Sequence, residues 1–140
     1  MVELYAAFYE HDRTTASAYI NHQERRVRLT GRTRESLALD ERRLMAEVSA
    51  GSVGAFGPLY DRCCIRAYRV AYSICRDDDR AQGAVQEAFL SIWNSRASYR
   101  QQRGTVAAWL LTVVRHRAIE LERRNGRDAI RRASCEQLQK

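Results

Sequence analysis

Apolar residues recur every three or four positions along several stretches of the sequence, and this spacing constrains the fold more than any other feature. The longest such stretch covers about five turns, and its members are Phe56, Tyr60, Cys63, Cys64, Ala67, Val70, Ala71, Ile74 and Cys75. Helices have this repeat on the face that packs into a core. No segment shows the strict alternation of a half-buried strand. The sequence therefore predicts an all-α fold, with a three-helix core and a short leading helix.

Capping residues indicate where the first two helices begin. Asp40 is a good N-cap for the leading helix, which Gly51 would end, and Ser52 would cap the next helix. Pro58 predicts a kink or a helix start, because it cannot donate a hydrogen bond to the carbonyl of Gly54.

The two remaining core helices have similar signals. The three aspartates at 77–79 suit the N-terminus of a helix over 80–94, and no further ligands stand at the spacing of a calcium loop. Thr105 is a suitable N-cap for the last helix, and Asn125 with Gly126 predicts its end. The expected organisation is a flexible N-terminal extension over 1–39, a helical domain over 40–126 and a polar tail over 127–140.

Length and composition limit the classes of protein. A chain of 140 residues suits one domain. It has no apolar run of 18 or more residues and no signal peptide at its start, which predicts a cytoplasmic protein without a membrane span. The four cysteines, at 63, 64, 75 and 135, show no metal-ligand spacing with the three histidines, so we expect core thiols and one thiol in the tail. No constellation indicates an enzyme, a metal site or a cofactor.

The positive charge is concentrated in one part of the chain. Residues 1–95 contain 13 Arg and 13 acidic residues, whereas residues 96–132 contain ten Arg against three acidic residues, a net charge of +7. A genomic bias toward arginine would explain arginine over lysine, but not the clustering. Clustered arginines are typical of a surface that binds a polyanion. The stretch from Gly104 to Arg124 lies within this region, and we expect it to contact nucleic acid.

Three stretches together resemble region 2 of the extracytoplasmic-function (group 4) sigma factors, which belong to the sigma-70 family of bacterial RNA polymerase. These stretches are DERRLMAEVSAGSVGAFGPLYDR, DDDRAQGAVQEAFLSIW and RGTVAAWLLTVVRHRAIELERR, and they cover about residues 40–126. Each is weak alone, and the combination is specific. The resemblance implies a factor that binds core polymerase and recognises and melts the promoter −10 element.

The resemblance also implies site residues. The helix with Gln86 and Glu87 would dock on the coiled coil of the polymerase β′ subunit, with Gly83 and Leu90 beside them. The loop 95–104 and the following helix would bind the non-template strand of the −10 element. The groups available there are Ser98, Tyr99, Arg100, Arg103, Trp109, Thr112, Arg115, His116, Glu120, Arg123 and Arg124. Trp109 also suits packing that supports the loop.

The sequence departs from the family at three points. Gly83 stands where the family usually has an Asp that helps to bind polymerase, and His116 stands where many relatives have Asn. Region 4, which reads the −35 element, does not follow before the chain ends. These departures leave two alternatives: a module that mainly binds an anti-sigma factor or another regulator, and a nucleic-acid-binding helical protein of another kind.

Overall fold

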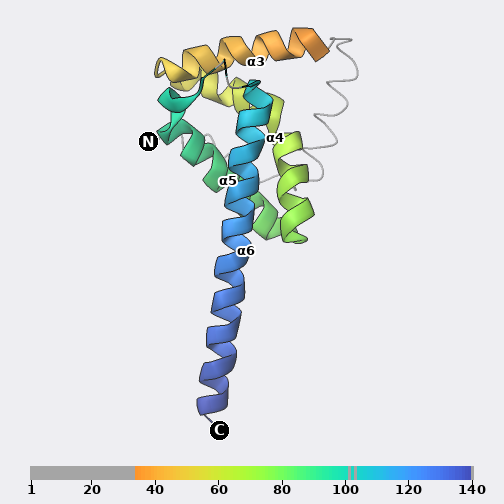
Figure 1. Cartoon of the computed structure of the whole chain (residues 1–140), viewed down its shortest axis with the longest axis vertical. Helices are drawn as coiled ribbons and strands as arrows, with labels where there is room; N and C mark the ends of the chain where they lie inside the picture. Colours follow the sequence, from red (N-terminus) through yellow and green to blue (C-terminus); the bar gives the residue numbers. More distant parts are fainter. Residues whose placement is uncertain (1–33, 101, 103, 140) are drawn as a thin grey trace.

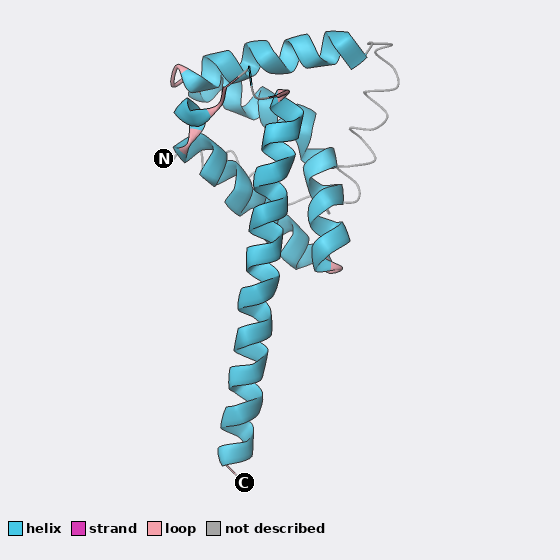
Figure 2. Cartoon of the chain, viewed as in Figure 1, coloured by secondary structure: helices cyan, strands magenta, loops and turns pink. Residues whose placement is uncertain are grey.

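The computed structural model describes residues 34–100, 102 and 104–139, and these residues are almost entirely helical, without a strand (Figures 1 and 2). The helices are α3 (Arg34–Ser49), α4 (Val53–Cys75), α5 (Asp78–Asn94), the 3-10 turn η1 (Arg96–Ser98) and α6 (Val106–Leu138). Helices α4, α5 and α6 each pack on the other two, and α3 lies across one end of them. The predicted all-α fold, with a three-helix core and a leading helix, is confirmed.

The predicted N-caps Ser52 and Thr105 are confirmed, and of the three aspartates Asp77 caps α5, which begins at Asp78, two residues earlier than predicted. The side chain of Ser52 accepts a hydrogen bond from the amide of Ala55 at 3.3 Å, and Asp77 accepts one from the amide of Arg80 at 2.9 Å. Thr105 caps α6 in the same way, since its hydroxyl accepts from an amide in the first turn at 3.1 Å. Each cap pairs an amide that the helix itself cannot satisfy. Helix α4 continues through Pro58, so the proline does not mark a helix start.

The leading helix begins earlier than predicted. Asp40 lies inside α3, not before it, so its prediction as an N-cap is wrong. Its carboxylate instead lies 3.2 Å from the guanidinium of Arg62 on α4. The neighbouring residue Glu41 is buried and pairs with Arg66 on α4. The carboxylates of Asp40 and Glu41 therefore pair with arginines on α4 and do not cap α3. Of the extension predicted over 1–39, residues 1–33 lie outside the described part of the chain.

The last helix ends later than predicted. Asn125 and Gly126 lie within α6, and residues 127–138 are helical instead of forming a tail. Glycine ends a helix when it adopts a positive φ angle, and among the described glycines only Gly51 and Gly104 do so. Gly126 keeps a helical backbone at a cost of about 1 kcal/mol relative to alanine. The sequence from Ala129 onward is rich in good helix formers, which favours continuation.

The core lies where α4, α5 and α6 meet. Phe89 is its centre, with ring contacts to Phe56 at 6.0 Å and to Tyr60 at 4.7 Å between centroids. Alanines at the helix contacts allow close approach; the fully buried ones are Ala67, Ala71, Ala81, Ala84, Ala88 and Ala118. The one-sided burial of α6 fixes which of its residues face outward.

The cysteines behave as expected. Cys63, Cys64 and Cys75 are buried, and Cys135 is exposed. Burial, with a smaller contribution from Glu41, raises the pKa of Cys63 to about 12. Within the described residues, no group of His, Cys, Asp and Glu could hold a metal ion. Within the same part of the chain, every helix is too short or too polar to cross a membrane.

Candidate nucleic-acid interface

The loop before α6 is closed over the start of that helix by Tyr99. The Tyr99 ring lies against Trp109 of α6, with centroids 5.4 Å apart and the planes tilted by 53°. The Tyr99 hydroxyl donates a hydrogen bond to the carbonyl of Gly104 at 3.2 Å. Gly104 has a φ of 139°, a conformation that other residues rarely adopt. The turn at Gly104 and the aromatic pair therefore set where the loop meets the helix.

The aromatic pair has one side in the core and one side in solvent. Tyr99 and Trp109 are both partly buried and pack against the hydrophobic core. This contact supports the packing role that the sequence suggested for Trp109. Both rings are partly exposed, and the exposed Arg100 directly follows Tyr99 in the chain. A partly exposed aromatic ring suits stacking of an unpaired base.

The other loop residues predicted to bind DNA are largely exposed. The hydroxyl of Ser98 donates to the carbonyl of Ser95 at 2.6 Å, which closes the 3-10 turn. Arg100 donates to the carbonyls of Ala97 at 2.6 Å and Tyr99 at 3.1 Å, so its guanidinium is held on the loop surface. Arg103 lies outside the described residues.

Arg96 and Trp93 form a contact that the sequence reasoning missed. The guanidinium carbon of Arg96 lies 4.4 Å from the centroid of the Trp93 ring, a cation–π geometry. The carbonyl of Arg96 accepts a hydrogen bond from the Ser49 hydroxyl of α3 at 3.0 Å. The loop is therefore attached to α3 as well as to α6. The only feature of the sequence that could have indicated this contact is the three-residue spacing of Trp93 and Arg96 at the end of a helix.

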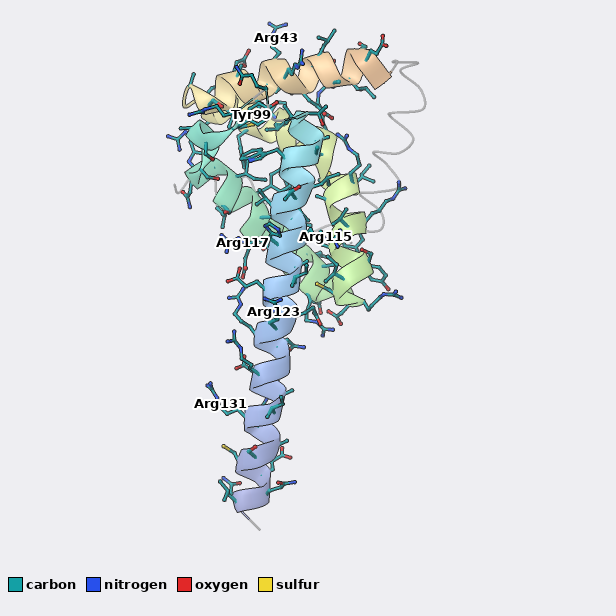
Figure 3. All side chains as sticks on the ribbon, in the orientation of Figure 1. Arg43, Tyr99, Arg115, Arg117, Arg123 and Arg131 are labelled. Atoms are coloured by element: carbon teal, nitrogen blue, oxygen red, sulfur yellow. The ribbon has the colours of Figure 1, made fainter. Side chains whose placement is uncertain are left out.

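One edge of α6 is exposed along its first half. Thr112, Arg115, His116, Glu120 and Arg123 are all exposed, on the side opposite the buried residues. The Thr112 hydroxyl donates to the carbonyl of Ala108 at 2.8 Å, so its oxygen can still accept another bond. In Figure 3, the labelled Arg115, Arg117, Arg123 and Arg131 all project from this helix. Side chains that can donate hydrogen bonds and side chains that can accept them thus follow Trp109 along the exposed edge of α6.

Two ion pairs and one arginine hydrogen bond connect α5 with α6. Arg80 of α5 lies 2.7 Å from Glu122, and Arg124 lies 2.8 Å from Glu87 of α5. Arg117 pairs with Glu120 at 3.1 Å and donates to the Ser91 hydroxyl of α5 at 3.0 Å. Two residues from the predicted DNA-binding set, Glu120 and Arg124, therefore already have partners within the protein.

The four residues predicted to bind polymerase share the outer surface of α5. Gly83, Gln86, Glu87 and Leu90 are each partly exposed, and Leu90 also packs against the core. A Cβ atom at Gly83 would meet nothing within 4 Å. This surface is therefore open to a larger side chain at Gly83.

Comparison with known proteins identifies the family. The family model for sigma-70 region 2 matches residues 59–128. The chain is 31% identical over 77 residues to ECF RNA polymerase sigma factor SigK of Mycobacterium ulcerans, which covers 55% of this chain and 41% of that protein. It is 35% identical over 77 residues to the protein of the same name in Mycobacterium sp. strain KMS, covering 55% and 40%. No solved structure matches the chain.

A longer match of 92 residues, at 30% identity, links the chain to ECF RNA polymerase sigma factor SigK of Mycobacterium tuberculosis strain CDC 1551. It covers 66% of this chain and 48% of that protein. The chain thus spans less than half the length of the curated relatives it matches. The family match covers most of α4, all of α5, the loop described above and the first two-thirds of α6. The chain therefore belongs to the sigma-70 family, of the extracytoplasmic-function type, through its region 2.

Proposed function

We propose that this chain acts as region 2 of an RNA polymerase sigma factor, in the cytoplasm, and stabilises the opened −10 element of a promoter. The observation that carries the proposal is the continuity of one edge of α6. Its partly exposed aromatic pair, Tyr99 with Trp109, is followed on the same edge by exposed Thr112, His116 and Arg123. Stacking, base-edge and phosphate-binding groups therefore follow one another on a rigid helix.

This order of groups suits single-stranded DNA. An unpaired base has a free π-face and a free Watson–Crick edge, whereas a paired base has neither. Stacking on an aromatic side chain contributes about 1–3 kcal/mol per base. Extruding a base from the duplex costs a few kcal/mol. The stacking of one base thus nearly offsets the cost of extruding it from the duplex. Contacts between the arginines and phosphates supply the rest of the binding free energy.

The polymerase would bind on a different surface. We assign the outer side of α5, with Gln86, Glu87 and Leu90, to the coiled coil of the β′ subunit. A half-exposed leucine between polar and acidic groups suits a helical partner with a complementary positive edge. Helix α5 packs directly on α6, so one molecule presents both proposed surfaces.

A second function is favoured by Gly83. The missing carboxylate leaves the α5 surface without one acidic group that the family uses for polymerase. A module that binds an anti-sigma factor or another regulator through this surface is therefore the alternative. It differs from the main proposal in needing no contact with polymerase.

Capture of core polymerase separates the two functions. The immobilised full chain should retain purified core enzyme, and Glu87→Lys should reduce the amount retained several-fold because it reverses a charge at the proposed contact. Glu136→Lys is the matched control, since Glu136 is exposed near the far end of α6. Failure of the wild-type chain to retain core enzyme at low salt would favour the alternative.

A further inference from the structure

Arg96 attaches the start of the loop 95–104 to two other helices. Its guanidinium carbon lies 4.4 Å from the centroid of the Trp93 ring, and its Nη1 donates a hydrogen bond to the carbonyl of Trp93 at 2.9 Å. Its own carbonyl accepts a hydrogen bond from the Ser49 hydroxyl at 3.0 Å. Figure 1 shows the turn after α5 close to the end of α3 that leads into α4. Both the side chain and the backbone of Arg96 therefore hold the loop in place.

The ring under the Arg96 guanidinium is itself fixed by the core. Trp93 is partly buried and packs edge-on against Phe56 of α4, with centroids 5.5 Å apart and the planes at 75°. Phe56 is buried and contacts Phe89 at the centre of the core. A planar guanidinium over an indole face is stabilised by both charge and stacking. The position of Arg96 is thus set by helices outside the loop.

Arg96 and Tyr99 hold the two ends of one short turn. The 3-10 turn η1 begins at Arg96 and is followed directly by Tyr99, and the amide of Ser98 donates to the carbonyl of Ser95 at 2.8 Å inside it. Tyr99 in turn contacts Trp109. A hydrogen-bonded turn of three residues cannot absorb a displacement at one end. A shift of Arg96 would therefore move Tyr99 relative to Trp109.

Arg100 of the same loop differs from Arg96 in exposure and in contacts. Arg100 is exposed, and its guanidinium donates to carbonyls of the loop itself. Arg96 is partly buried, and one face of its guanidinium lies over Trp93. Arg100 therefore suits a phosphate contact, whereas Arg96 suits support of the loop.

We propose that Arg96 is a positioning residue for single-stranded DNA. It holds the loop so that the Tyr99–Trp109 pair can stack on an unpaired base, and it does not itself contact the DNA. The inference rests on the proposed function, because it concerns the shape of the same site. Loss of the contact with Trp93 lowers the fraction of molecules whose loop is ready to bind, and the apparent affinity falls by that fraction.

Binding of two DNA probes by the full chain tests the proposal. The probes are an A/T-rich single strand and the matching duplex, and each dissociation constant is measured as a function of salt. Arg96→Gln should weaken binding of the single strand about two- to five-fold, as expected for loss of a partly exposed cation–π contact. The log–log salt slope should stay at its wild-type value, because no phosphate contact is lost. Binding of the duplex should not change.

Two further variants separate support of the loop from direct contact with DNA. Ser49→Ala removes the hydrogen bond to the Arg96 carbonyl without changing any charge, so it should also weaken binding of the single strand. Arg100→Gln should instead reduce the salt slope by about 0.7, the value for one phosphate contact on a single strand. Arg43→Gln is the control for charge, since the Arg43 side chain is 83% exposed on α3. It should leave binding of the single strand unchanged.

The NMR signal of the Trp109 indole N–H reports the position of the loop directly. Trp93 and Trp109 are the two tryptophans of the chain, so Trp109→Phe assigns both indole signals. Arg96→Gln and Ser49→Ala should each shift the Trp109 signal in the free protein, and Arg43→Gln should not. A loss of global stability alone would leave the signal of the folded protein in place.

A fall of the salt slope by about 0.7 in Arg96→Gln would overturn the proposal, since Arg96 would then contact a phosphate. Unchanged binding of the single strand by Arg96→Gln, or an unmoved Trp109 signal, would also overturn it. If the wild-type chain still prefers the single strand to the duplex in these cases, the proposed function stands. A wild-type chain without that preference would contradict the proposed function, even where the Trp109 signal shows that Arg96 positions the loop.

Discussion

Arg124 on α6 and Glu87 on α5 form an ion pair, with a guanidinium nitrogen 2.8 Å from a carboxylate oxygen. The two side chains are 44% and 41% exposed, so solvent screens the pair. Glu87 belongs to the surface proposed for polymerase, and Arg124 belongs to the group proposed for DNA. The pair is therefore the most direct link between the two proposed surfaces.

The Glu87–Arg124 pair should contribute little to stability. A double-mutant cycle of Glu87→Gln and Arg124→Gln, followed by urea unfolding, should give a coupling free energy of about 0.2–1 kcal/mol, as exposed pairs do. The coupling should shrink at high salt. A coupling above about 2 kcal/mol, or one that does not depend on salt, would show that the pair is more protected than its exposure indicates.

Glycine at position 83 should cost stability. Gly83→Ala should raise the free energy of unfolding by about 0.5–1 kcal/mol, because Gly83 lies inside α5 and its added Cβ meets nothing within 4 Å. Gly104→Ala is the contrasting variant, since the φ of 139° at Gly104 disfavours a side chain even where space is free. Chemical denaturation measures the free energy of unfolding of both variants. The prediction fails if that free energy rises in both variants or falls in both.

Removing the partner of a buried carboxylate should destabilise the contact between α3 and α4. Glu41 is only 5% exposed, and Arg66 supplies its positive partner. Arg66→Met should lower the free energy of unfolding by about 1–3 kcal/mol. The double variant Glu41→Met with Arg66→Met should recover part of this loss, since no unpaired charge remains. Thermal unfolding measures both, and a double variant worse than the sum of its single variants would contradict this explanation.

Only one of the four thiols should react quickly in the native protein. Burial raises the pKa of Cys63 to about 12 and that of Cys75 to about 11, so both stay protonated at pH 8. The thiolate is the reactive form, and Cys64 is also buried. Titration with an aromatic disulfide reagent should therefore modify Cys135 first, and Cys135→Ser should remove the fast phase. A fast phase that persists in Cys135→Ser would mean that a core thiol is accessible.

The sequence predicts the helices well and their ends less well. Apolar spacing identified the core face of α4, and side-chain chemistry identified Ser52 and Thr105 as caps. Asp40 was misassigned because its partner, Arg62, lies on another helix and only the fold brings them together. Gly126 was misassigned because glycine permits a positive φ without requiring one.

The exposure of the candidate residues on α6 was predictable from the sequence, and their contacts within the protein were not. The exposed edge of α6 follows from the helical repeat, so Thr112, His116 and Arg123 could be placed from sequence. The pairing of Glu87 with Arg124 joins residues 37 positions apart and depends on how α5 packs on α6. The contact between Arg96 and Trp93 depends in the same way on how the loop leaves α5.

The preference for opened DNA is tested most directly by competition between two DNA forms for the complex of this chain with core polymerase. The account predicts that single-stranded non-template −10 DNA displaces a labelled probe at lower concentration than the matching duplex, and that Trp109→Ala removes most of this difference. Glu136→Gln, on the far part of α6, should leave it unchanged. Equal competition by the two forms, or a preference that survives Trp109→Ala, would contradict the account.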